Sequence, residues 1–139
     1  MAAKLPGFPE LLQRIAATPS RDAYFFYPYM PMMPFLTARN DVSPYDVFTP
    51  GYTLPFQYQE VCIAVMRRAY WIVIDRNWTA PQTLKRLFPM MRNERPAETT
   101  KFEHALSSSF ESVGEYSAFV LMHRRADEVD ATVCTGIAQ

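Results

Sequence analysis

Apolar residues along this chain follow two periodicities, and these divide most of it into helices and strands. A helical spacing over residues 8–16 and again over 53–68 predicts two amphipathic helices. Unbroken apolar runs rich in Tyr, Phe, Ile and Val predict strands over residues 22–27 and 70–75. Because both runs are apolar on both faces, we expect central strands of a sheet with helices on either side.

Turn and capping signals complete the assignment. Two capping boxes mark helix starts, Thr79 with Gln82 and Thr100 with Glu103. A short strand is expected over residues 45–48.

The C-terminal part predicts a β-hairpin, because residues 110–113 and 117–124 flank a Gly-Glu pair at 114–115. The whole pattern predicts a single α/β domain over residues 1–125. We expect a small, largely parallel sheet in two or three layers, with flanking helices and the C-terminal hairpin. Residues 126–139 show no clear period and are expected to form a loosely held tail.

Composition narrows the class of protein without naming a function. The 139 residues carry 14 basic and 14 acidic side chains, so nothing indicates binding to nucleic acid or to an anionic membrane surface. A hydrophobic fraction of 49% fits a packed core. No apolar stretch in the sequence is long enough to span a membrane.

The two cysteines lie far apart and fit no metal-binding spacing. Cys62 falls on the apolar face of the helix predicted over residues 53–68, where we expect a small buried hydrophobic residue. Cys134 falls in the predicted tail, where we expect a free thiol rather than a disulfide partner. On this interpretation cysteine usage does not settle the redox compartment.

Candidate binding residues follow the two predicted strands. Tyr27 and Tyr29 come at the end of the first strand, Asp75 and Trp78 at the end of the second, and Arg39 follows the Met- and Pro-rich turn after the first. If the strands are neighbours, their carboxyl ends converge on one rim, where open α/β sheets usually bind ligands. Aromatic rings and a carboxylate suit a sugar or polyol. The alternative is a local role, with the aromatic residues capping the core.

Catalytic and cofactor motifs are lacking. The only histidines, His104 and His123, accompany no Gly-x-Ser-x-Gly elbow, and four glycines form no phosphate-binding loop. A paired-carboxylate mechanism would combine Asp75 with Asp41 or Asp46, but nothing in the sequence fixes their distance. We therefore expect no cofactor and no metal site.

Six short segments, taken in order, carry a resemblance to a known family. They are residues 11–19, 22–28, 35–39, 48–51, 70–75 and 119–125. They resemble the soluble C-terminal portion of polytopic bacterial glycosyltransferases of the dolichyl-phosphate-mannose-protein mannosyltransferase-like family, which use lipid-linked sugars. The shared features include a strand ending in Tyr-Pro, a Leu-Thr-x-Arg turn and a last strand ending in Arg-Arg.

The resemblance implies a non-catalytic accessory domain of a membrane glycosyltransferase, in an extracytoplasmic (periplasmic) setting. The family's catalytic carboxylates lie in a loop between membrane helices that this sequence does not contain, so no catalytic residue is carried over. The implied partner is a glycan or a lipid-linked sugar, with any membrane tether lying in a parent protein.

Two other interpretations remain open. One is a stand-alone cytoplasmic hydrolase or transferase that uses Asp75. The other is a protein-interaction module that uses the turn containing Met30, Met32 and Met33.

Overall fold

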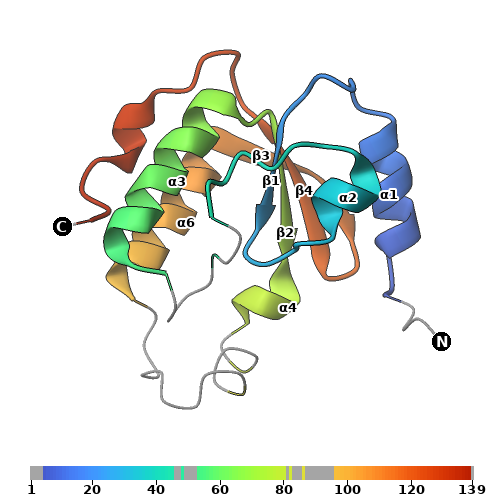
Figure 1. Ribbon diagram of the computed structural model, residues 1–139, viewed down its shortest axis with the longest axis horizontal. Coiled ribbons are helices and arrows are strands. Elements are labelled where there is room, and N and C mark those ends of the chain that lie inside the picture. Colours follow the sequence, from blue (N-terminus) through green and yellow to red (C-terminus); the bar gives the residue numbers. More distant parts are fainter. Residues whose placement is uncertain are drawn as a thin grey trace.

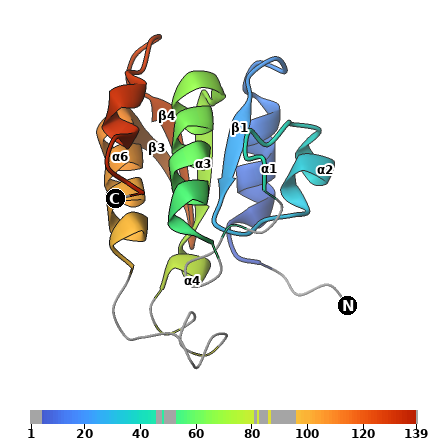
Figure 2. The same cartoon turned by 60° about the vertical axis from the view of Figure 1, so that its left-hand side comes forward.

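The computed structural model describes residues 5–45, 48, 53–80, 82, 86 and 96–138. Within them a four-stranded sheet lies between two layers of helices, α1 and α2 on one face and α3 and α6 on the other (Figures 1 and 2). In chain order the elements are α1 (Phe8–Ala16), β1 (Tyr24–Tyr27), α2 (Met33–Thr37), α3 (Pro55–Arg68), β2 (Trp71–Asp75), α4 (Arg76–Thr79), α6 (Ala97–Ser109), β3 (Phe110–Tyr116), β4 (Phe119–Arg124) and a 3₁₀ turn, η1 (Ala131–Cys134). The α/β class is confirmed, in its three-layer form.

The sheet is mixed, so the expectation of a largely parallel sheet is wrong. The strand order is β1-β2-β4-β3, and only β1 and β2 are parallel. The terminal hairpin is confirmed, but β4 pairs antiparallel with β2 as well as with β3. The apolar run of β2 shows that both of its faces are covered, and that pattern carries no information on the direction of its neighbours.

The hairpin turn lies later than expected. It falls between Tyr116 and Phe119, where Ser117 adopts a left-handed φ of 56°. Gly114 instead lies inside β3, where the pairing register shifts between Ser112 and Gly114. A glycine inside a strand often marks such a bulge rather than a turn.

Strand β1 is an edge strand, which contradicts the expected central position. All four of its residues are buried because helices cover both of its faces. Its outer edge is partly paired with the segment around Asp41: the Tyr24 N–H donates to the Asn40 carbonyl (3.1 Å), and the Val42 N–H donates to the Tyr24 carbonyl (2.9 Å). Burial on both faces therefore reports helical cover and not the position of a strand in its sheet.

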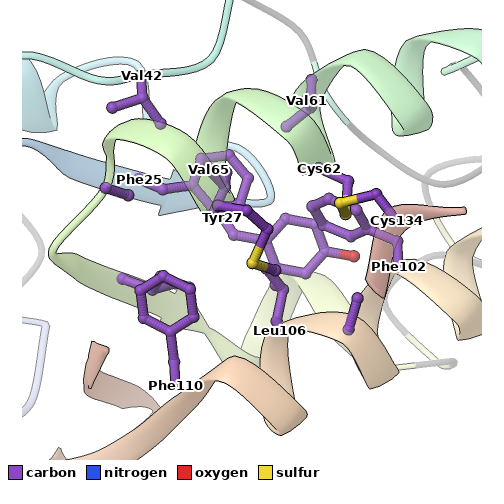
Figure 3. Close-up of a cluster of buried hydrophobic side chains, with 14 of the residues drawn as sticks. Phe25, Tyr27, Val42, Val61, Cys62, Val65, Phe102, Leu106, Phe110 and Cys134 are labelled. Carbon is purple, nitrogen blue, oxygen red and sulfur yellow. A yellow bond between two sulfur atoms is a disulfide. The ribbon is translucent and has the colours of Figure 1, made fainter. Parts of the chain in front are cut away.

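Alternation along the strands produces two separate cores. Tyr24 and Phe26 of β1 point toward α1 and α2, whereas Phe25 and Tyr27 point toward α3 and α6. The second core is the larger one, and Figure 3 shows Phe25, Tyr27, Phe102 and other side chains of this cluster filling the space between the sheet and the two helices.

Two expectations about the C-terminal segment are wrong. Cys134 forms a disulfide with Cys62 of α3, with a Cα–Cα distance of 5.8 Å (Figure 3). Both cysteines are fully buried, and Ile137 is buried in the same core. The segment is thus docked on α3 and α6 rather than loosely held, and Cys134 is not a free thiol. Neither the long separation of the two cysteines along the sequence nor the weak periodicity of the segment predicts this docking.

The helix boundaries agree with those predicted from the sequence at some positions only. Helix α1 covers the expected residues, but α6 begins at Ala97, so Thr100 lies inside the helix and not at its start. The expected strand over 45–48 and the helix opened by Thr79 and Gln82 fall largely outside the described residues. Among the described helices, none combines the length and hydrophobicity needed to span a membrane.

Two buried arginines complete the C-terminal ends of helices. Arg39 donates to the carbonyls of Ile15 (3.1 Å) and Thr18 (2.8 Å) at the end of α1. Arg124, at the end of β4, donates through Nε to the Ala69 carbonyl (2.9 Å) just beyond α3. Cationic side chains at these positions satisfy carbonyls that the helix leaves unpaired and also favour the negative end of the helix dipole.

Candidate functional site

The carboxyl ends of β1 and β2 meet at one rim because these two strands are parallel neighbours, with Tyr27 opposite Ile74. Tyr29 follows β1, and Trp78 belongs to α4, which continues directly from β2. Their rings pack edge to face, with centroids 5.3 Å apart and an interplanar angle of 66°. The fold therefore brings together two aromatic side chains that are distant in the sequence.

Asp75 is the last residue of β2 and lies at the same rim. Its carboxylate caps α4 by accepting the Asn77 N–H at 3.0 Å. Because side chains alternate along a strand, it projects from the same face as Trp71 and Val73, toward the α1 layer. Partial burial raises the pKa of Asp75, and the bond from the Asn77 N–H opposes this rise.

A small groove of about 160 Å³ contains Asp75 and Tyr29. Its lining residues are Leu5, Phe8, Tyr29, Met30, Pro31, Met32, Met33, Leu36, Asp75 and Phe119. The walls are apolar, and Asp75 is the one carboxylate among these lining residues. Such a groove suits an aliphatic or ring face next to a hydroxyl or a cation, and it is smaller than a typical site for a whole ligand.

Tyr27 and Arg39, which we expected at this rim, are not part of it. Tyr27 is only 1% exposed and points to the opposite face, where its hydroxyl donates to Oε1 of Glu103 at 2.9 Å. Arg39 is buried at the end of α1, over the ring of Tyr24 at 5.6 Å, near the other end of β1. The alternation of the strand turns Tyr27 away, and Arg39 is used to cap α1.

The histidines also lie away from the rim. His123 is opposite Trp71, at the far end of β2 from Asp75, and its ring packs against the indole with centroids 4.3 Å apart. His104 is exposed on α6, in the opposite layer. A catalytic triad based on Asp75 therefore has no histidine within its groove.

An exposed apolar surface surrounds the groove. Met32 is 60% exposed, and Phe35 of α2 is 82% exposed; Leu5 and Leu36 are also exposed. Met33, by contrast, is 2% exposed and packs in the core against α1. Of the methionines in this turn, Met33 is therefore structural, whereas Met32 is accessible to a partner.

Sequence reasoning missed a second, larger cavity. It measures about 440 Å³ and lies beside the outer edge of β1, where Asn40, Asp41 and Ser43 contribute polar groups. The sequence suggested Asp41 only as a possible partner for Asp75, yet the two carboxylates line different cavities. The turn cluster over residues 40–44 was the signal that polar groups gather here.

Comparison with known proteins leaves the family undecided. No protein-family model matches the chain, and neither the curated proteins nor the solved structures include a significant match. The candidate site therefore rests on its own geometry: two aromatic rings and a partly buried carboxylate at the carboxyl ends of two parallel strands.

Proposed function

We propose that this domain is a non-catalytic accessory module of a membrane glycosyltransferase and binds a glycan or a lipid-linked sugar at the Asp75 rim. The observation that carries the proposal is the convergence of Tyr29, Trp78 and Asp75 at one rim. Aromatic rings stack on the apolar faces of sugars, and a carboxylate accepts hydrogen bonds from sugar hydroxyls.

The shape of the groove supports a ligand with an apolar portion. The apolar walls next to Asp75 suit an alkyl chain or aglycone, while the carboxylate and the Tyr29–Trp78 pair suit the sugar. The buried Cys62–Cys134 disulfide agrees with an extracytoplasmic compartment, where such bonds persist.

The lining of the groove favours binding over the alternative of an enzyme that uses Asp75. Among the described residues that line it, there is no histidine, cysteine, serine or lysine, so Tyr29 is the one side chain beside Asp75 that could transfer a proton. Asp41 lines the other cavity, and Asp46 lies outside the described residues. A second acid for a paired-carboxylate mechanism is thus not found at this rim among the described residues.

Binding of octyl β-glucoside below its micelle concentration, compared with free glucose, tests the proposal. In amide NMR titrations we expect saturable shifts at Asn77 and Trp78, and weaker binding of octyl β-glucoside by Trp78→Ala and Asp75→Asn. Asparagine also caps helices well, so Asp75→Asn removes the charge while keeping the start of α4. Phe56→Ala, which truncates another exposed aromatic residue, is the matched control. Unchanged binding in both rim variants would remove the site assignment.

The exposed apolar surface favours a second candidate, a protein-interaction module. Apolar patches of this kind frequently mark interaction sites. A Met32→Ser, Phe35→Ser double variant should then lose a partner in a pull-down that Asp75→Asn retains. Loss of the same partner in both variants would assign it to the Asp75 groove instead.

A further inference from the structure

We propose that the cavity beside the outer edge of β1 is a second binding site, built for a neutral saccharide, with Asp41 as its principal recognition residue. Its volume of about 440 Å³ falls within the range of about 300–1,000 Å³ usual for small-molecule sites. The cavity is separate from the Asp75 groove, and the two share only Met30 and Pro31 in their linings.

The walls of the cavity are of two kinds. Apolar residues line one part: Met30, Pro28, Pro31 and Pro34, together with Phe26 and Phe48, whose side chains are almost fully buried in the two cores. Polar groups form the rest: Asn40, Asp41, Ser43, Tyr45 and Arg68. A sugar ring has the same division, with apolar C–H faces and a belt of hydroxyls, so both kinds of wall find a match in one molecule.

The Asp41 carboxylate is held in place by the backbone. The Ser43 N–H donates to its Oδ1 at 3.0 Å, and the N–H of Phe26 on the outer edge of β1 also donates to it. An ionised carboxylate has about four acceptor positions, so about two remain for hydroxyl groups of a ligand. Burial raises the pKa of Asp41 to about 6, so this group is mostly ionised at pH 7 but poorly hydrated.

Arg68 supplies the complementary donor. It lies in the last turn of α3, is exposed, and lines the cavity. Acceptors and donors together suit hydroxyl groups, which both donate and accept, better than they suit an anion, which Asp41 would repel. Arg67 precedes it on the same helix, is also exposed, and does not line the cavity.

The inference shares its class of ligand with the proposed function but none of its key residues. Failure at one site is therefore separable from failure at the other. Backbone amides of Asn40, Asp41 and Ser43 report on this cavity, whereas those of Asn77 and Trp78 report on the Asp75 rim.

The test is an amide NMR titration of the full chain with D-glucose, D-galactose and D-mannose in turn, with phosphate as a charged comparison. We expect saturable shifts at the three cavity amides for at least one sugar. Asp41→Asn should weaken binding of that sugar about tenfold, because it loses a charge-assisted hydrogen bond. Arg68→Gln should weaken it several-fold, and Arg67→Gln should leave it unchanged. Each variant's fold is checked by its own amide spectrum.

Four outcomes would overturn the inference. They are the absence of saturable shifts for all three sugars, a response to phosphate alone, shifts confined to the Asp75 rim, and an equal loss in Arg67→Gln and Arg68→Gln. Shifts confined to the cavity would support the inference and leave the rim to be decided by the octyl β-glucoside titration. Because Arg68 is exposed, its variant tests the cavity even if Asp41→Asn does not fold.

Discussion

Removal of the Cys62–Cys134 disulfide should cost a large part of the stability of the fold. The bond joins residues 72 positions apart and fastens the C-terminal segment to α3. In the chain-entropy account, a cross-link over a loop of this length stabilises a protein by about 4 kcal/mol, because it restricts the unfolded chain. Domains of ordinary size have about 5–15 kcal/mol in total, so the bond would supply a substantial share.

Urea unfolding measures this contribution. The oxidised protein is compared with the Cys62→Ala, Cys134→Ala double variant, whose free energy of unfolding should be lower by about 4–5 kcal/mol. The part of this loss that exceeds the contribution of the cross-link reflects the small cavities left by two fully buried sulfur atoms. In a thermal scan, we expect the midpoint to fall by roughly 10–15 °C for a chain of this size.

The reduced wild-type protein separates the cross-link from packing, since it keeps both sulfur atoms and loses only the bond. We expect it to resemble the double variant closely. A difference of less than about 1 kcal/mol between oxidised and reduced protein would refute the reasoning, because the bond would then not constrain the unfolded chain. Alkylation of both thiols in the native, unreduced protein would refute it more directly.

Three further predictions test other parts of the structure. Gly7→Ala should lower the free energy of unfolding by about 2 kcal/mol or more in a urea titration. The reason is that Gly7 has a φ of 78° and that an added Cβ would lie 2.5 Å from the Tyr116 carbonyl. No loss of stability would mean that the start of α1 is free to move. Arg124→Met should lower the free energy of unfolding by about 3 kcal/mol, since it leaves buried carbonyls unpaired. Arg125→Met, at an exposed position, should lower it by less than about 0.5 kcal/mol. Equal losses would contradict the capping role of Arg124. The pKa of Asp41 in the folded state, about 6, exceeds its ordinary value of 3.8, so the folded state holds this proton more tightly than the unfolded state does. The free energy of unfolding should therefore fall by up to about 3 kcal/mol as the pH rises from about 4 to 6. Asp41→Asn should remove this decline, and an unchanged pH profile would show that another group causes it.

The sequence predicted those features that depend on neighbouring residues. Helix α1 and the strands β1 and β2 were found from apolar periodicity. The terminal hairpin was predicted from two segments flanking the Gly-Glu pair at 114–115, although its turn lies later, between Tyr116 and Phe119. The convergence of Tyr29 and Asp75 also followed, once the two strands proved to be parallel neighbours. Periodicity succeeds here because it reports which faces of an element are covered.

The features that the sequence did not predict depend on contacts between distant segments. Strand β1 is an edge strand, because its outer neighbour is an irregular segment and not another strand. The pairing of Cys134 with Cys62 depends on where the C-terminal segment docks. Arg39 follows a turn, which suggested an exposed cation, but the end of α1 lies close enough to bury it. None of these contacts has a local pattern.

The two capping arginines make the ends of the helices dependent on residues far along the chain. Arg39 is 24 residues from Ile15, and Arg124 is 55 residues from Ala69. The last carbonyls of α1 and α3 therefore gain these partners only when the segments that follow have docked. Separation of β4 from the sheet would also uncap α3, so a partly unfolded form would lose hydrogen bonds in two layers at once. Such coupling favours cooperative, all-or-none unfolding, in which the end of α3 and strand β4 exchange their amide hydrogens together.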